Sequence, residues 1–143
     1  SIEGLDTLIR PTTHIPVRRF DGLKLPCPDK SADIVMFVDV LHHTKKPGSL
    51  LAEAARVGRW VLIKDHLRKG LFANTTLKLM DWVGNAHHGV VLPYNYLSES
   101  EWDELFRKSG LTVACMNTSL GLYPPPLSWI FGRQLHFIAL CQS

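Results

Sequence analysis

Two apolar segments joined by an amphipathic segment constrain the fold of this chain more than any other feature. Residues 34–41 (IVMFVDVL) and 60–64 (WVLIK) are short, rich in valine and isoleucine, and almost uninterrupted by polar residues, which is typical of strands buried on both faces of a parallel sheet. Residues 47–57 have apolar side chains at helical spacing, begin with a proline and precede Gly58, which predicts a helix. This order predicts a right-handed βαβ unit whose two strands end at the same edge of one sheet.

The rest of the chain supplies shorter strands and two further helices. Four more segments have the composition and bounding turns of strands: residues 2–8, 14–20, 111–116 and 135–141. The last two predict an antiparallel pair with a long Gly/Pro-rich connection. Helical spacing predicts a helix over 70–83, and a capping box of Ser98 and Glu101 starts another helix, which ends at Gly110. Residues 1–143 are therefore expected to form a single α/β domain.

Charge and composition exclude several kinds of partner and environment. Of the 143 residues, 16 are Lys or Arg and 13 are Asp or Glu, and the basic residues are scattered without the stripe that follows a nucleic-acid backbone. The apolar runs are much shorter than the ~20 residues that span a bilayer, and the three cysteines lack paired metal spacing. We expect a cytoplasmic protein with no nucleic-acid partner and no membrane segment.

Residues 20–44 (FDGLKLPCPDKSADIVMFVDVLHHT) resemble the middle of class I S-adenosylmethionine-dependent methyltransferases of the small-molecule type. The turn DGLKLP at 21–26, Asp33 at the start of a strand and LHHT at 41–44 are each similar to a motif of that family. The similarity continues to the C-terminus. It implies a Rossmann-like sheet, mostly parallel with an antiparallel C-terminal strand. The family's first strand and its glycine-rich loop have no counterpart here, so we expect an N-terminally truncated domain with weakened cofactor binding.

The same resemblance implies that S-adenosyl-L-methionine is the cofactor and that these residues bind it: Asp6, Asp21, Gly22, Leu23, Phe37 and Val38. Asp6 matches the acidic residue that holds the ribose hydroxyls, and a carboxylate at a strand end can accept both hydroxyls. Asp21 matches the carboxylate placed against the adenine amino group. An ordinary turn is the alternative for both aspartates, and Phe37 and Val38 are mainly core positions that could also line the cofactor pocket.

Candidate catalytic residues lie in the loops expected at the carboxyl edge of the sheet. Asp39 is a carboxylate inside an apolar strand, which is costly unless it is paired or at a pocket edge, so it either faces the site or bonds to loop amides. Five histidines fall in these loops: His42, His43, His66, His87 and His88. We expect His42 and His87 to act as a base or to contact the substrate. Adjacent histidines usually point apart, and no HxH or HExxH spacing occurs, so no metal is expected.

These features favour methyl transfer to a small-molecule acceptor, impaired by the missing strand, as the leading function. Such catalysis needs alignment of the nucleophile with the methyl group, plus a base where the nucleophile carries a proton. The alternative is a non-catalytic remnant that acts as a self-associating binding or structural domain, and a third hypothesis is a metal-dependent hydrolase built on the histidines. Without the first strand, residues 34–41 lack a ladder partner on one side. This predicts that the N-terminal strands fill the gap or that two copies pair into a homodimer.

Overall fold

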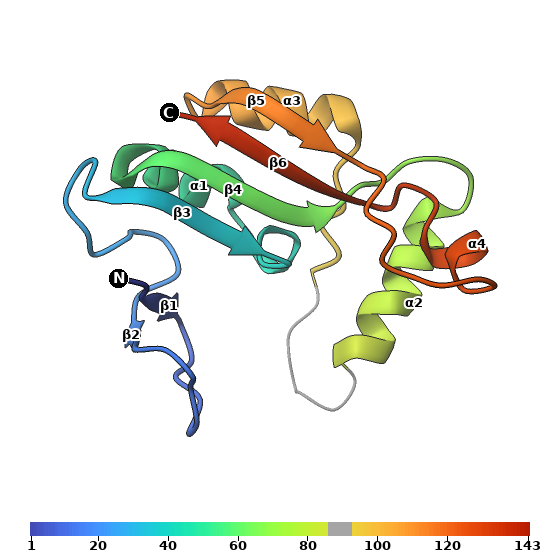
Figure 1. Cartoon of the computed structure of the whole chain (residues 1–143), viewed down its shortest axis with the longest axis horizontal. Helices are drawn as coiled ribbons and strands as arrows, with labels where there is room; N and C mark the ends of the chain where they lie inside the picture. Colours follow the sequence, from blue (N-terminus) through green and yellow to red (C-terminus); the bar gives the residue numbers. More distant parts are fainter. Residues whose placement is uncertain (86–92) are drawn as a thin grey trace.

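A four-stranded sheet forms the centre of the computed structural model, which describes residues 1–85 and 93–143 (Figure 1). Its strands follow the order β3 (Ala32–Val38), β4 (Gly58–His66), β6 (His136–Gln142) and β5 (Thr112–Asn117). β3 and β4 are parallel, whereas β6 is antiparallel to both of its neighbours. Three strands therefore run one way and the C-terminal strand runs the other, which confirms the predicted sheet.

Two helices cover one face of this sheet and build the core with it. Helix α1 (Pro47–Val57) has the predicted bounds and connects β3 to β4 as the crossover of the βαβ unit. Helix α3 (Glu99–Lys108) begins at the predicted capping box and contributes Trp102 and Phe106, whose ring centroids lie 5.4 Å apart. The Trp102 ring also lies 5.0 Å from that of Phe137 on β6. These aromatic contacts join helix α3 to the sheet in one apolar cluster.

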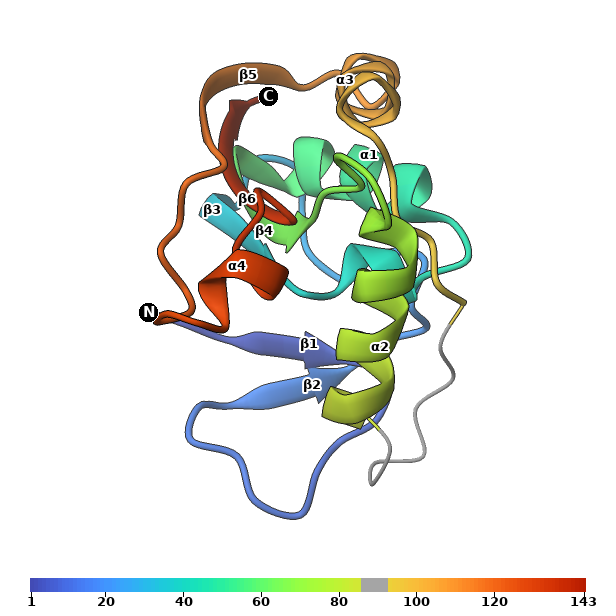
Figure 2. The same ribbon diagram turned by 90° about the vertical axis from the view of Figure 1, so that its right-hand side faces the viewer.

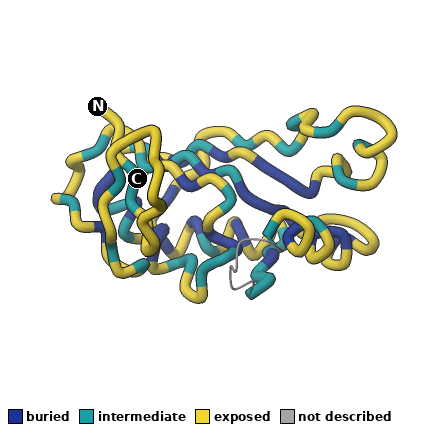
Figure 3. The backbone as a smooth tube through the Cα atoms, turned by 90° about the horizontal axis from the view of Figure 1, so that it is seen from below, coloured by how far each residue is buried: buried dark blue, intermediate teal, exposed yellow. Residues whose placement is uncertain are grey.

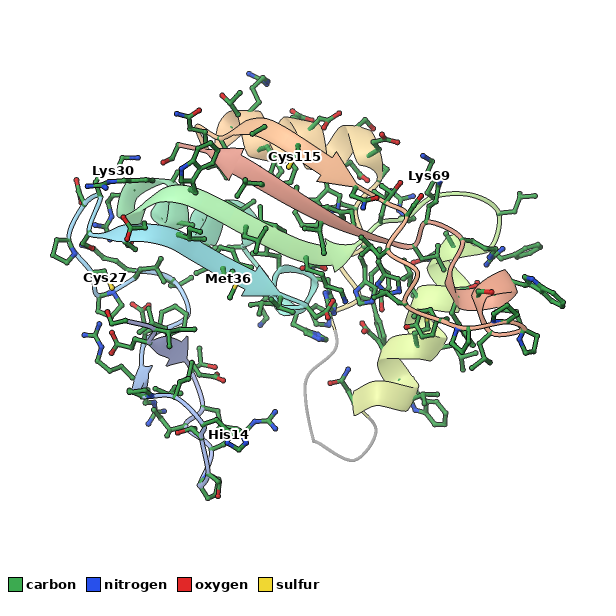
Figure 4. All side chains as sticks on the ribbon, viewed as in Figure 1. His14, Cys27, Lys30, Met36, Lys69 and Cys115 are labelled. Atoms are coloured by element: carbon green, nitrogen blue, oxygen red, sulfur yellow. The ribbon has the colours of Figure 1, made fainter. Side chains whose placement is uncertain are left out.

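The opposite face of the sheet is open in the part of the chain that the structure describes. Ile34, Met36 and Val38 of β3 are 55%, 53% and 53% exposed, and Figure 4 labels Met36 on this strand and Cys115 on β5. The prediction that residues 34–41 are buried on both faces is therefore wrong. Side chains alternate along a strand, so Phe37 reaches the core while its neighbours meet no described helix, and β4 alone pairs with β3 among the described strands.

The N-terminal strands form a separate two-stranded sheet. β1 (Gly4–Asp6) and β2 (Val17–Arg19) pair with each other in parallel, and Figures 1 and 2 both show them below the main sheet. Both are shorter than predicted because the flanking apolar residues, such as Ile2 and Leu8, pack against little and stay exposed; Figure 3 shows the tube near the N-terminus as mostly exposed. Because β1 and β2 form their interstrand hydrogen bonds with each other, the expectation that they pair with β3 is wrong for the described residues.

Two further helices, α2 and α4, occur in the described part of the chain. Helix α2 (Ala73–Asn85) starts three residues later than the predicted 70–83, because Gly70 and Phe72 have φ values of 86° and 59°, which a right-handed helix does not contain. The short helix α4 (Ser128–Phe131) lies in the connection between β5 and β6. Within residues 1–85 and 93–143, every helix is too short or too polar to cross a bilayer.

Candidate functional site

Buried polar side chains gather where β3 and β4 end, beside helix α2. A 3₁₀ helix, η1 (Leu41–His43), follows β3 and carries two adjacent histidines. Together with residues from β4, α2 and β6 it surrounds an open cavity of about 320 Å³. The cavity lies at the strand edge where the βαβ unit predicted a site, and four side chains on its wall dominate its chemistry: His42, His66, Asp81 and His136.

Asp65, at the end of β4, ties the two strand ends together. Its side chain is fully buried, and its Oδ1 lies 2.6 Å from Nδ1 of His42. Its Oδ2 accepts a hydrogen bond of 2.9 Å from the amide of Leu41. Although burial favours the neutral acid, the hydrogen bond from His42 keeps the pKa of Asp65 below its usual value. Asp65 is therefore a buried carboxylate whose oxygens are satisfied by η1.

His42 lies between two carboxylates. Its Nδ1 faces Asp65, and its Nε2 lies 3.4 Å from Oδ1 of Asp81 on helix α2. Burial lowers the pKa of His42, but hydrogen bonding and charge from Asp65 and Asp81 outweigh burial and raise it to about 9. In the absence of a ligand, the two carboxylates therefore favour the protonated form of His42 at neutral pH.

Asp81 is anchored by an aromatic hydroxyl. The hydroxyl of Tyr96 donates a short hydrogen bond to Oδ2 of Asp81 and lies 3.1 Å from the carbonyl oxygen of Leu77. Burial, followed by this hydrogen bond, raises the pKa of Tyr96, so Tyr96 stays protonated and serves as a donor. Sequence analysis did not identify Asp81 as a site residue. One signal was present for Asp81, because it follows the buried Leu77 by four residues and so shares the apolar face of its helix.

Two further histidines line the cavity in their neutral form. Burial is the main cause that lowers the pKa values of His66 and His136 to about 4. The Nδ1 atom of His66 lies 3.2 Å from Nδ1 of His42, and both ring nitrogens of His136 are buried without a hydrogen-bond partner among the described residues. His136, the first residue of β6, was not a predicted site residue because nothing local distinguishes it from a core position.

Asp39 lies at the rim of this cavity. Its Oδ1 lies 2.7 Å from Nζ of Lys64 on β4, and its own amide donates to the carbonyl oxygen of Lys64. Its φ of 53° ends the extended backbone of β3. The partner of this carboxylate is thus a lysine of the neighbouring strand and not a set of loop amides. His87, predicted as a catalytic residue, lies outside the described residues.

The residues predicted to bind the cofactor divide between two places. Asp6 and Asp21 are exposed at the ends of β1 and β2; Oδ1 of Asp6 accepts from the amide of Leu8, and Oδ1 of Asp21 accepts from the amides of Leu23 and Lys24. The hydrogen bonds from the amides of Lys24 and Leu23 are the main cause that lowers the pKa of Asp21.

Gly22 brings the two loops into contact. It has a φ of 79°, and a Cβ atom there would lie 3.0 Å from the side chain of Thr7, so a larger residue would push the loops apart. On β3, by contrast, Phe37 is buried in the core and only Val38 is open to a ligand. The predicted set is therefore divided: Asp6, Asp21, Gly22 and Leu23 form a corner at the surface, whereas Phe37 lies in the core.

A family model matches the first part of the chain. Residues 4–59 match the model described as a methyltransferase domain. This range contains both exposed aspartates and both histidines of η1. No curated protein sequence matches the chain significantly.

Solved structures share the fold over nearly the whole chain. A protein of Haloferax volcanii, classed as a methyltransferase and solved in complex with the Trm112 methyltransferase activator, has a TM-score of 0.68 and 18% identity, covering 98% of this chain and 70% of that chain. An S-adenosylmethionine-dependent methyltransferase of Mesorhizobium loti has a TM-score of 0.69 and 14% identity, covering 99% and 79%. One of Thermotoga maritima has a TM-score of 0.60 and 20% identity, covering 90% and 64%. These comparisons confirm the predicted resemblance to class I S-adenosylmethionine-dependent methyltransferases.

Proposed function

We propose that this protein, which has the fold of class I methyltransferases, transfers a methyl group from S-adenosyl-L-methionine to a small-molecule acceptor. The observation that carries the proposal is the position of the cavity at the carboxyl ends of the parallel strands β3 and β4, where open α/β sheets bind their ligands. The match of residues 4–59 to a methyltransferase domain supports the same reaction. The acceptor would occupy the cavity, and the cofactor would extend from the corner at β1 and β2.

The exposed corner fits the adenosine half of this cofactor. In Asp6 and Asp21 one carboxylate oxygen is held by backbone amides, and the other makes no hydrogen bond to the described residues. A held carboxylate with one open oxygen can accept hydrogen bonds from ribose hydroxyls or from an adenine amino group. Leu23 and Val38 add exposed apolar surface. When bound, the cofactor supplies an electrophilic methyl group on sulfur, so the protein has mainly to align the acceptor with it.

The cavity offers the acceptor two kinds of polar group. His42 is cationic when flanked by Asp65 and Asp81, so it suits orientation of the acceptor better than removal of its proton. His66 and His136 are neutral and can accept a hydrogen bond from a hydroxyl or amine. We keep His87 in the proposal as a substrate contact. Asp39 is kept as the carboxylate that holds Lys64 at the rim of the cavity.

The uncovered edge of β3 favours a second function, that of a non-catalytic domain that self-associates. The specific observation is the exposed apolar row of β3 beside an edge that no described strand covers. We propose that a second copy of the chain pairs there as a homodimer. The Haloferax volcanii protein is bound to an activator protein, so a different protein at this edge is the other occupant to test.

Calorimetry with S-adenosylmethionine and S-adenosylhomocysteine tests the enzymatic function. We expect both to bind, and Asp6→Ala and Asp21→Ala each to weaken binding at least tenfold. Asp103→Asn, an exposed carboxylate of α3, should leave the affinity unchanged. No binding of either compound by folded protein would favour the non-catalytic domain, and full affinity in Asp21→Ala would show that the corner is not the adenosine site.

A further inference from the structure

Two buried histidine nitrogens at the cavity lack hydrogen-bond partners. They are Nε2 of His42 and Nδ1 of His43, both on η1, and neither makes a well-formed hydrogen bond to the described residues. The ion-pair contact of Nε2 of His42 with Oδ1 of Asp81 is long, at 3.4 Å. A buried imidazole nitrogen without a partner is costly. His42, His43 and Asp81 each offer one possible ligand atom, and these three atoms lie within 4.8 Å of one another.

We propose that His42, His43 and Asp81 bind one divalent transition-metal ion such as Zn²⁺. Two imidazole nitrogens and one carboxylate oxygen, each about 2.0–2.2 Å from the ion, form a ligand set that zinc prefers. The three atoms already lie within 4.8 Å of one another, which is close enough for one ion to contact all of them. This inference replaces the sequence-based expectation that no metal binds, and it goes beyond the proposed methyl transfer.

The expectation of no metal depended on adjacent histidines pointing apart. In η1 they do not: the ring centroids of His42 and His43 lie 3.9 Å apart, with their planes tilted by 47°. The tight 3₁₀ backbone and the bond from Asp65 to the inner nitrogen of His42 turn the outer nitrogen of that ring toward Asp81. Neither effect can be read from residue spacing.

Both ends of the ligand set are held by partners that a metal site requires. Asp65 fixes the His42 ring through Nδ1, which is the arrangement of a carboxylate–histidine–metal triad. Tyr96 holds the other oxygen of Asp81, so Oδ1 stays directed at His42. Two of the three ligands, His42 and Asp81, are therefore oriented before an ion arrives, which lowers the conformational entropy lost on binding.

The surroundings leave room for a fourth ligand. The three side chains line the open cavity of about 320 Å³, so one coordination position would face a water molecule or an oxygen or nitrogen atom of a small ligand. Three protein ligands with one open position are the pattern of reactive zinc sites, whereas structural sites are closed by four. The metal would thus contact whatever occupies the cavity.

A second possible ligand set, Asp39, His42 and His66, is less suitable. Asp39 is engaged by Lys64, and the Nδ1 atoms of His42 and His66 already lie 3.2 Å from each other. An ion there would have to break an ion pair and separate two contacting rings. The two sets share only His42, so substitutions at Asp39 and Asp81 distinguish them.

Metal binding can be measured on tag-free protein that has been stripped with a chelator. We expect calorimetric titration with Zn²⁺ to show one ion per chain and Co²⁺ to give the visible absorption of a four-coordinate site. His43→Gln and Asp81→Asn should abolish stoichiometric binding, whereas Asp39→Asn and His14→Gln, the latter an exposed histidine of the N-terminal arm (Figure 4), should bind like the wild type. Circular dichroism checks that each variant is folded.

The outcomes separate clearly. Failure of folded wild-type protein to bind Zn²⁺ or Co²⁺ stoichiometrically overturns the proposal, as does wild-type binding in both His43→Gln and Asp81→Asn. If Asp81→Asn does not fold, His43→Gln decides, because His43 is only half-buried and its nitrogen has no protein partner to lose. Cofactor calorimetry is a separate measurement, so failure of the metal site and failure of the proposed function are distinguishable.

Discussion

The Nδ1 atom of His42 lies 2.6 Å from Oδ1 of Asp65, and this contact joins the turn after β3 to the end of β4. Neither side chain is exposed to solvent. The carboxylate also accepts the amides of Leu41 and His66, so one buried group fixes the backbone of both strand ends. The geometry of the cavity therefore depends on a carboxylate that does not itself line it.

Asp65→Asn should be strongly destabilising. Breaking a buried ion pair by removing one charge costs about 3–5 kcal/mol, and the asparagine NH2 group would place a donor where the surrounding N–H groups need an acceptor. Urea unfolding with chelator present measures the loss in free energy of unfolding. Asp33→Asn, which breaks the exposed pair with Arg59, is the matched control and should change stability little. An equal loss in the free energy of unfolding for both variants would show that the Asp65 contact does not stabilise the fold more than an exposed ion pair does.

Tyr96→Phe should affect both stability and the proposed metal site. The variant removes the only hydroxyl that the described residues supply to Asp81, and an unsatisfied buried acceptor costs about 1–3 kcal/mol. Because Tyr96 orients a proposed ligand, we expect Zn²⁺ affinity to fall by about tenfold to a hundredfold. Tyr94→Phe is the control, since the Tyr94 hydroxyl makes no hydrogen bond to the described residues. Unchanged metal affinity in a stable Tyr96→Phe variant would contradict the orienting role.

Local patterns were sufficient to predict much of the fold and part of the site. Helix α1 has its predicted bounds because apolar spacing, a proline and a following glycine all act within its own sequence. The parallel direction of β3 and β4 then follows from the crossover, which places His42 beside Asp65. These predictions needed no contact between distant segments beyond the handedness of the βαβ unit.

The rest depends on contacts that no local pattern encodes. Asp81 meets His42 only because helix α2 packs beside the strand ends, and Tyr96 reaches Asp81 from the segment before helix α3. The apolar composition of β3 predicted burial on both faces, but burial depends on which segments cover a strand, and Ile34 remains exposed among the described residues. Ring orientation is equally hidden, since a dipeptide of histidines has the same sequence whether its nitrogens diverge or converge, as in η1.

Glu101 should give helix α3 a dependence on acid pH. Hydrogen bonds from Ser98, followed by the contact with Arg68, lower the pKa of Glu101 to about 2. Its folded pKa lies below the unfolded value of about 4.3, so its stabilising effect is complete above that value and is lost as pH falls toward 2. The urea midpoint of Glu101→Gln should therefore lie below that of the wild type at pH 6 and approach it near pH 2. Asp103→Asn on the same helix should show no such convergence, and a constant gap for Glu101→Gln would contradict the assignment.

Self-association through β3 should depend on its exposed apolar row. A strand that is paired on one side presents unsatisfied amides and carbonyls to another strand, and here that strand also carries the exposed Ile34 and Val38. We expect light scattering to show a concentration-dependent dimer, and Ile34→Lys to shift it toward monomer because a charge would be buried at the new interface. Leu79→Lys, which changes an equally exposed apolar residue of α2, should leave the dimer unchanged. Hydrogen exchange gives a second readout, because pairing protects the amides of β3 that face away from β4. A monomer at all concentrations, with those amides unprotected, would show that the edge of β3 stays open in solution.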